Sequence, residues 1–293
     1  LTANGGDTYS WSNNATTPSI NVTAGNTYTV TATSAAGCTS TASETVTFNA
    51  NPAVTVTANG PTVFCQGGSL TLTATGGSNY VWSNGDQGAS TTVNQSGSYF
   101  VTVTNAAGCT SQSSLVNVTV NAVPVVAAIN GANSVCEGGN MTLTSATAGG
   151  VWTSANNFIA TIDGAGNVTG LNAGSTTITY TVSVNGCTAS TVAQINILNN
   201  PVTPTITASG ATSLCPGGSV VLFASNAANY QWSNGPQTPF IVATQSGAYT
   251  VTAIGLNGCS ATSANTNVVV YSLPTVAAIT GSNDVCVGST TVL

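Results

Sequence analysis

The sequence of 293 residues contains no lysine, no arginine and no histidine, and only six acidic residues. Proteins that bind nucleic acids need cationic side chains to neutralise phosphates, so this composition excludes that function. It also disfavours binding to anionic membrane surfaces. Without histidine there is no Ser-His-Asp or Cys-His arrangement and no imidazole metal ligand. The few acids are not close enough in sequence to form a carboxylate pair for acid–base catalysis. We therefore expect no enzyme activity, no metal and no cofactor.

Long apolar runs are absent as well. No run approaches the ~20 residues that a transmembrane helix requires, which argues against membrane insertion. Low charge also occurs in disordered chains, but those are poor in β-branched residues, whereas this chain is rich in Val, Ile and Thr. Apolar residues alternate with a period of two, and no segment keeps the 3.6-residue period of a helix. The sequence predicts an all-β protein whose surface is solvated by Thr, Ser and Asn.

In place of charge the sequence has a repeat. The segment Tyr99–Cys109 recurs as Tyr28–Cys38 and Tyr249–Cys259, and a looser copy spans Tyr180–Cys187. A second class of cysteine precedes a Gly-rich turn, at successive spacings of 71, 79 and 71 residues. A period of this length suits a small β-sandwich better than a solenoid. The cysteines of the second class are Cys65, Cys136, Cys215 and Cys286.

The repeats divide the chain into five segments. Leu1 corresponds to Leu72, so the chain begins inside a repeat and is expected to be a piece of a longer protein. Asn51-Pro52 marks the first junction, because proline cannot donate to a sheet ladder. We predict a partial repeat at 1–50, complete repeats at 51–121, 122–200 and 201–272, and the start of another at 273–293.

The repeat at 51–121 shows the expected strands most clearly. In the variant repeat at 122–200, Asp163-Gly164 predicts a hairpin turn. Eight cysteines in a chain that looks secreted predict disulfides, and zinc is disfavoured because no C-x-x-C pair occurs. The strands expected in the repeat at 51–121 are Val54–Val56 (strand A), Leu70–Thr73 (B), Tyr80–Trp82 (C), Ser90–Val93 (E), Tyr99–Thr104 (F) and Leu115–Val120 (G).

A tryptophan on the third main strand and a Gly-x-Tyr that opens the fifth resemble an immunoglobulin-type sandwich, with Tyr99 as a tyrosine corner. The motifs Cys-x-Gly-Gly-Ser, Tyr-x-Trp-Ser-Asn-Gly, Ser-Gly-x-Tyr-x-Val and Gly-Cys-Thr resemble Ig-like repeats of Bacteroidota surface proteins. Those proteins leave the cell by the type IX system and include gliding-motility adhesins. The stretch Gly166–Tyr180 is similar to the bacterial Ig-like group 2 domain.

This resemblance implies tandem immunoglobulin-like β-sandwich repeats arranged end to end as a rod. It also places one aromatic set in the sandwich cores. The tryptophans fit a core better than a ladder for stacking carbohydrates. The core set is Trp11, Trp82, Trp152, Trp232, Tyr28, Tyr99 and Tyr249.

The resemblance also bears on the disulfides, for which pairing inside a repeat (Cys65 with Cys109) is the open alternative. In an Ig-type sandwich, Cys65 and Cys109 would be carried to opposite ends at ~3.3 Å per residue. That is beyond the ~7 Å Cα limit of a disulfide. The resemblance therefore implies that each cysteine between strands A and B meets the cysteine between strands F and G of the next repeat. The implied pairs are Cys65–Cys187 and Cys136–Cys259, with partners outside the chain for Cys38, Cys109, Cys215 and Cys286.

The function that the resemblance implies is extracellular, at the cell surface. The chain would be a structural stalk segment of a large bacterial adhesin or filament, involved in surface attachment or gliding. Its partners would be flanking repeats of the same chain, with surface glycans or other cells reached through other regions. Two alternatives stay open: a carbohydrate- or protein-binding module of a secreted enzyme, and a subunit of a multichain filament. Calcium at Asp7, Asp86, Asp163 and Asp284 is disfavoured because acids this sparse supply too few oxygens.

Overall fold

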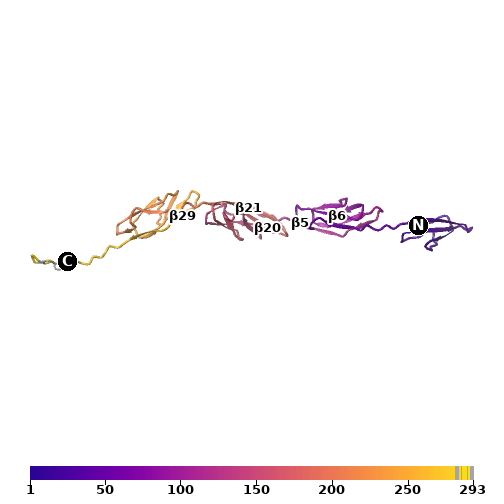
Figure 1. Cartoon of the computed structure of the whole chain (residues 1–293), viewed down its shortest axis with the longest axis horizontal. Helices are drawn as coiled ribbons and strands as arrows, with labels where there is room; N and C mark the ends of the chain where they lie inside the picture. The colour runs from indigo at the N-terminus through magenta and orange to yellow at the C-terminus, as the bar shows by residue number, and fades with distance from the viewer. Residues whose placement is uncertain (281–283, 285, 289, 291–293) are drawn as a thin grey trace. The chain divides into compact units, whose positions relative to one another are not determined.

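The computed structural model describes residues 1–280, 284, 286–288 and 290. These residues form strands and no helix, so the predicted all-β fold is confirmed (Figure 1). Accordingly, the described part of the chain has no helix that could cross a bilayer. The chain forms two compact units, one made of Leu1–Val123 with Val184–Cys187, and one made of Pro124–Ser183 with the residues from Thr188 onward.

Within the first unit, residues 54–121 form a complete sandwich. One antiparallel sheet has the order β4-β6-β8, and the other has the order β11-β10-β7. Strand β12 pairs in parallel with β5 and antiparallel with β9. This is the immunoglobulin arrangement, in which strands A, B and E face strands C, F and G, and A′ runs beside the end of G. The strands are β4 (Thr55–Ala58), β5 (Val63–Cys65), β6 (Leu70–Thr75), β7 (Asn79–Trp82), β8 (Ser90–Val93), β9 (Gly97–Tyr99), β10 (Val101–Thr104), β11 (Thr110–Gln112) and β12 (Val116–Asn121).

Alternation along β6 explains the core of this sandwich. Leu70, Leu72 and Ala74 point inward and are buried, while Thr71 and Thr73 face solvent. Those two threonines hydrogen-bond across the sheet to hydroxyls on β8. The inward residues pack in one cluster with Trp82, Val93, Val101, Val103 and Val118.

The observed F and G strands are each divided, whereas the sequence predicts each as one continuous strand. Strand F is interrupted at Phe100, and G is split into β11 and β12. Between the two halves, the Ser113 hydroxyl accepts the Val101 N–H at 3.1 Å, in place of a main-chain carbonyl. Ser263 does the same for Val251 in the last repeat. Because the serine hydroxyl accepts this N–H, strand G can separate from strand F at this point without leaving a backbone donor of strand F unpaired.

The first repeat contributes one sheet of order β1-β2-β3. Its core holds Trp11, Ile20, Tyr28 and Val30, all buried. The strands are β1 (Thr8–Trp11), β2 (Asn26–Thr33) and β3 (Thr39–Val46).

The second unit begins with the variant repeat, built around the long hairpin of β20 and β21, both labelled in Figure 1. One sheet has the order β14-β21-β20-β17 and another has the order β15-β19-β18. The hairpin expected at Asp163-Gly164 connects the antiparallel strands β18 and β19. The strands are β13 (Ile129–Asn130), β14 (Ser134–Cys136), β15 (Asn140–Thr142), β16 (Thr144–Ser145), β17 (Val151–Ser154), β18 (Ala160–Ile162), β19 (Asn167–Gly170), β20 (Gly174–Val184) and β21 (Cys187–Leu198).

The last complete repeat has the same strand order as the sandwich at 54–121. Its separate core is centred on Leu222, Trp232 and Val251. The start of a further repeat expected at 273–293 lies partly outside the described residues, and 273–280 carry no strand. The strands are β22 (Ile206–Ala208), β23 (Ser213–Leu214), β24 (Val220–Ala224), β25 (Asn229–Trp232), β26 (Phe240–Ala243), β27 (Gly247–Tyr249), β28 (Val251–Ile254), β29 (Ser260–Thr262) and β30 (Thr266–Val270).

The expected core aromatics fall into two groups. Trp11, Trp82, Trp232 and Tyr28 are buried, whereas Trp152, Tyr99 and Tyr249 are half-buried at the edges of their clusters. In the variant repeat Tyr180 is the more deeply buried ring, and Trp152 packs on it with centroids 4.4 Å apart.

Candidate functional site

Two disulfides connect residues that belong to different repeats. Cys65 bonds to Cys187 with a Cα–Cα distance of 5.6 Å, and Cys136 bonds to Cys259 at 5.7 Å. Both distances lie in the usual range for disulfides. In each pair, the first cysteine ends an A′ strand, and the second lies at the start of strand G in the following repeat. Pairing of Cys65 with Cys109 does not occur in the structure.

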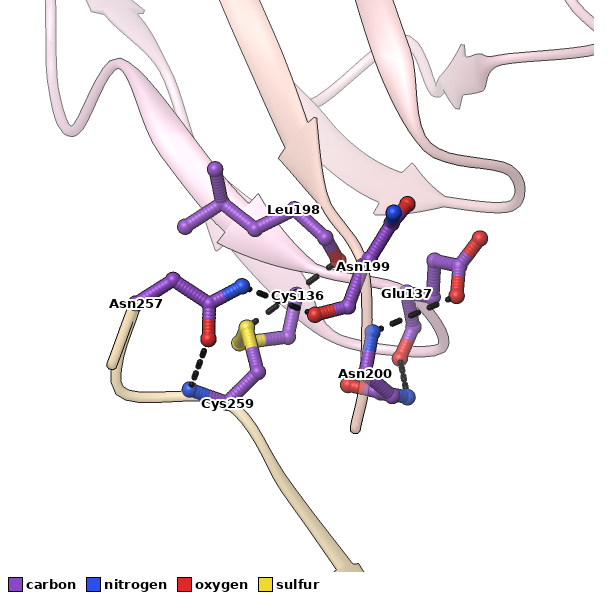
Figure 2. The surroundings of a disulfide bond; sticks show 7 residues. All are labelled: Cys136, Glu137, Leu198, Asn199, Asn200, Asn257 and Cys259. Atoms are coloured by element: carbon purple, nitrogen blue, oxygen red, sulfur yellow. Dashed lines mark hydrogen bonds between the residues drawn. A yellow bond between two sulfur atoms is a disulfide. The ribbon is translucent and has the colours of Figure 1, made fainter. Parts of the chain in front are cut away.

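The Cys136–Cys259 bridge lies against the segment that links its two repeats (Figure 2). Strand β14 runs parallel to the end of β21, which places Cys136 beside Leu198. The Leu198 carbonyl accepts the Glu137 N–H at 3.0 Å and lies 4.0 Å from the Cys259 Sγ. On the other side, Asn257 donates its side-chain amide to the Asn199 carbonyl at 2.8 Å. Its Oδ1 accepts the Cys259 N–H at 3.1 Å, which ties that loop to the linker.

Glu137 fixes the other flank of this linker. Its Oε2 accepts the Asn200 N–H at 3.4 Å, and its carbonyl accepts the Asn200 side-chain amide at 3.0 Å. Its Oε1 accepts the Ala173 N–H at 2.8 Å. The chain has no cationic side chain, and the carboxylate accepts hydrogen bonds from backbone N–H groups instead. The linker is therefore hydrogen-bonded on both sides of the disulfide, as Figure 2 shows.

The Cys65–Cys187 bridge uses the same elements with different residues. Strand β5 runs parallel to the end of β12, which places Cys65 beside Asn121. The Asn121 carbonyl accepts the Gln66 N–H at 2.8 Å, and its side chain donates to the Asn185 carbonyl at 3.0 Å. Asn185 and Gly186 both have positive φ, as a two-residue Asn-Gly hairpin turn requires. That turn presents Cys187 to the bridge.

Cys109 forms no disulfide within the described residues, yet its surroundings match those of Cys259. Its Sγ lies 3.6 Å from the Asn49 carbonyl, as the Cys259 Sγ lies near that of Leu198. Asn105 donates its amide to the Ala50 carbonyl at 2.9 Å and accepts the Cys109 N–H at 3.0 Å. Asn257 makes the same two bonds beside Cys259. The loop and linker of a bridged junction are thus present at Cys109.

The other unbridged cysteines, Cys38, Cys215 and Cys286, are exposed. Cys215 follows β23, which runs parallel to the end of β30, and the Leu214 carbonyl accepts the Tyr271 N–H at 2.9 Å. This is the position that Cys65 and Cys136 occupy in their repeats. Sequence reasoning did not find Glu137, Asn105, Asn121 or Asn257. The available signal was the recurrence of asparagine beside the cysteines and at the repeat ends.

The tyrosine corner expected at Tyr99 is present as a hydrogen bond, and two other repeats contain the same bond. The Tyr99 hydroxyl donates to the Gln95 carbonyl at 3.0 Å, four residues upstream. Tyr28 and Tyr249 donate in the same way to Ala24 and Gln245. Tyr180 instead reaches across the repeat to the Thr147 carbonyl at 2.7 Å.

Two acids have perturbed titration. The hydroxyl of buried Thr91, followed by the Asn84 amide, lowers the pKa of Asp86. The side-chain amide and backbone N–H of Asn167 lower the pKa of Asp163 and order the turn between β18 and β19. Both carboxylates accept hydrogen bonds from residues of their own turns. The described residues contain no cluster of three potential metal-ligating side chains.

Comparison with known proteins found one matching family model and several solved structures. The bacterial Ig-like domain (group 2) family matches residues 119–192, a range that includes the Gly166–Tyr180 stretch. The DSCAM isoform 1.30.30 structure, the N-terminal eight Ig domains of Down Syndrome Cell Adhesion Molecule, is 14% identical, covering 92% of this chain and 44% of that chain (TM-score 0.31). The ICAM-5 D1-D4 ectodomain fragment is 13% identical over 84% of this chain and 83% of its own (TM-score 0.44).

Domains 1–6 of the surface layer protein SbsC are 17% identical over 89% of this chain and 47% of that chain (TM-score 0.25). This chain therefore spans less than half the length of the DSCAM and SbsC structures. No curated protein matched the chain.

Proposed function

We propose that this chain is a structural stalk segment of a large extracellular bacterial surface adhesin or filament, in which disulfides join successive Ig-like repeats. The observation that carries this proposal is the pairing of Cys65 with Cys187 and of Cys136 with Cys259. Each bond connects neighbouring repeats, where an antibody domain connects its own two sheets. Disulfides persist in oxidising compartments, which supports an extracellular site.

A stalk needs stiff junctions, because the linkers between domains are ordinarily where such chains bend. The bridge and the hydrogen bonds of Asn257 and Glu137 hold the linker at residues 199–200 from two sides. The matching surroundings of Cys109 favour a continuing series of such junctions. We assign Cys109 and Cys38 to partners in preceding repeats, and Cys215 and Cys286 to partners in following ones. Export by the type IX system and a role in attachment or gliding are supported by the motif resemblance.

The connectivity is tested by chymotryptic mapping without reduction, since the chain offers trypsin no lysine or arginine. Cleavage after aromatic residues separates Cys65 from Cys109 and Cys136 from Cys187. We expect Cys65–Tyr80 linked to Thr181–Phe223, and Val101–Trp152 linked to Thr250–Tyr271. A link between Cys65–Tyr80 and Val101–Trp152 would contradict the proposal, because that fragment carries Cys109 and Cys136 and the link would join Cys65 to one of them in place of Cys187.

The role as a stalk is tested separately. Glycan arrays probed with this chain should show no reproducible binding, whereas consistent binding would favour a carbohydrate-binding module. Imaging of the native assembly should show single threads. A thick fibre of many chains would instead favour the multichain filament.

A further inference from the structure

The two disulfides are interleaved along the chain. The second bridge opens at Cys136, before the first one closes at Cys187. The two covalent loops therefore share the segment from residue 136 to residue 187. This segment carries most of the core of the variant repeat, including Leu143, Val168 and Ile178.

Interleaving changes the shortest covalent route between Cys65 and Cys259. Along the backbone the two residues are 194 apart. Through the disulfides the route crosses to Cys187, runs backwards along the chain to Cys136, and crosses to Cys259. Only 51 residues separate Cys187 from Cys136. An extended residue spans ~3.3–3.6 Å, so the largest possible distance between Cys65 and Cys259 falls from about 640–700 Å along the backbone to about 170–180 Å through the disulfides.

We propose that the oxidised chain is an extension-limited tether, in which tension crosses the variant repeat between Cys187 and Cys136. The segment between these two cysteines, which the covalent route follows backwards, sets the fully stretched length between Cys65 and Cys259. The inference rests on the proposed stalk function for its purpose, and on the two disulfides for its geometry. The backbone segments 65–136 and 187–259, of 71 and 72 residues, are longer than the reversed segment and remain slack when it is taut.

The folded repeat is built to receive load at these two cysteines. Cys187 is the first residue of β21, and Cys136 lies beside Leu198, the last residue of that strand. Tension between the two cysteines therefore acts along β21 and along its parallel pairing with β14. The paired residues are Ser134 with Asn196, Val135 with Ile197, and Cys136 with Leu198. Because the load runs parallel to the strands, these pairs resist it together.

The test is single-molecule force–extension of the full chain, held at its termini through handles that do not use cysteine. The background carries Cys→Ser at Cys38, Cys109, Cys215 and Cys286, so that free thiols cannot exchange with the bridges. Reduction of this protein should lengthen its fully stretched state by 143 residues, or about 470–510 Å. An oxidised length equal to the reduced one overturns the inference.

Variants with a single bridge give a sharper signature. Cys65→Ser with Cys187→Ser leaves a shortest route of 71 residues, and Cys136→Ser with Cys259→Ser leaves one of 72. Each should stretch only about 70 Å further than the doubly bridged protein, because the loops overlap. The result that overturns the proposal is a gain of several hundred ångströms in either variant. If peptide mapping shows the expected pairs while these lengths do not appear, the tether fails and the bridged stalk stands.

Discussion

Removing one bridge should destabilise particular repeats and leave others unchanged. We consider Cys136→Ser combined with Cys259→Ser, which deletes the bond between the third and fourth repeats and keeps Cys65–Cys187. The deleted bond spans 123 residues. A loop of this size restricts the unfolded chain by about 4–5 kcal/mol in the chain-entropy account, and about 2–4 kcal/mol is typical of measured values. Each repeat has a separate core, so the loss should be confined to the two repeats that the bond joins.

Hydrogen exchange followed by mass spectrometry resolves the four repeats without altering their cores. A loss of about 3–4 kcal/mol accelerates exchange through unfolding by roughly 200- to 1,000-fold. We expect this acceleration in the slowest amides of β21 and β28, and little change in β6. The first repeat is the internal control, because neither disulfide includes it. Equal acceleration in β2, or none in β21, would refute the assignment of stability to this bond.

Three further changes test individual contacts. Tyr99→Phe removes the hydrogen bond to the Gln95 carbonyl and should lower the unfolding free energy of its repeat by about 1 kcal/mol in urea titrations, whereas exposed Tyr271→Phe should be neutral. Gly76 has a φ of +114°, and an added Cβ would lie 2.1 Å from the Ala53 carbonyl oxygen. Gly85 has a φ of +92° but open space around the added Cβ, so Gly85→Ala should lower the unfolding free energy by only about 1–2 kcal/mol. Gly76→Ala should lower it by more, and equal losses for the two variants would contradict the close contact at Gly76. Asp163 has a lowered pKa in the folded state, so its contribution to stability is present above its ordinary pKa of about 3.9 and is lost as pH falls through the lowered value. NMR titration should show the lowered pKa, and Asp163→Asn should remove that part of the acid sensitivity; an ordinary pKa for Asp163 would contradict the assignment.

Much of the fold follows from local sequence. Period-two alternation predicts strands such as β6 and β8, because the inward residues must be apolar and the outward ones are free to be threonine. The split in strand G was not predicted, since it depends on one hydroxyl, that of Ser113, completing a main-chain ladder. Nothing in the local pattern distinguishes that serine from an ordinary surface residue.

The junctions depend still less on local sequence. Asn257 and Asn199 are hydrogen-bonded although they are 58 residues apart in the sequence, and Glu137 and Asn200 although they are 63 apart. Each contact exists only after two strands have paired and a linker has been placed. Eight cysteines in a chain that looks secreted predict that bridges form, and the resemblance to Ig-type sandwiches implies which cysteines pair. The amide and carboxylate partners that surround those bridges could be found only from the folded chain.

The interleaved bonds have a consequence for proteolytic damage. Every peptide bond between Cys65 and Cys259 lies inside at least one of the two covalent loops. A single cut by a protease anywhere in that span leaves the two fragments joined by a disulfide, and a cut between Cys136 and Cys187 leaves them joined by both. The chain can thus be nicked in any of these repeats without being severed. Its complete breakdown would depend on a reductant as much as on a protease.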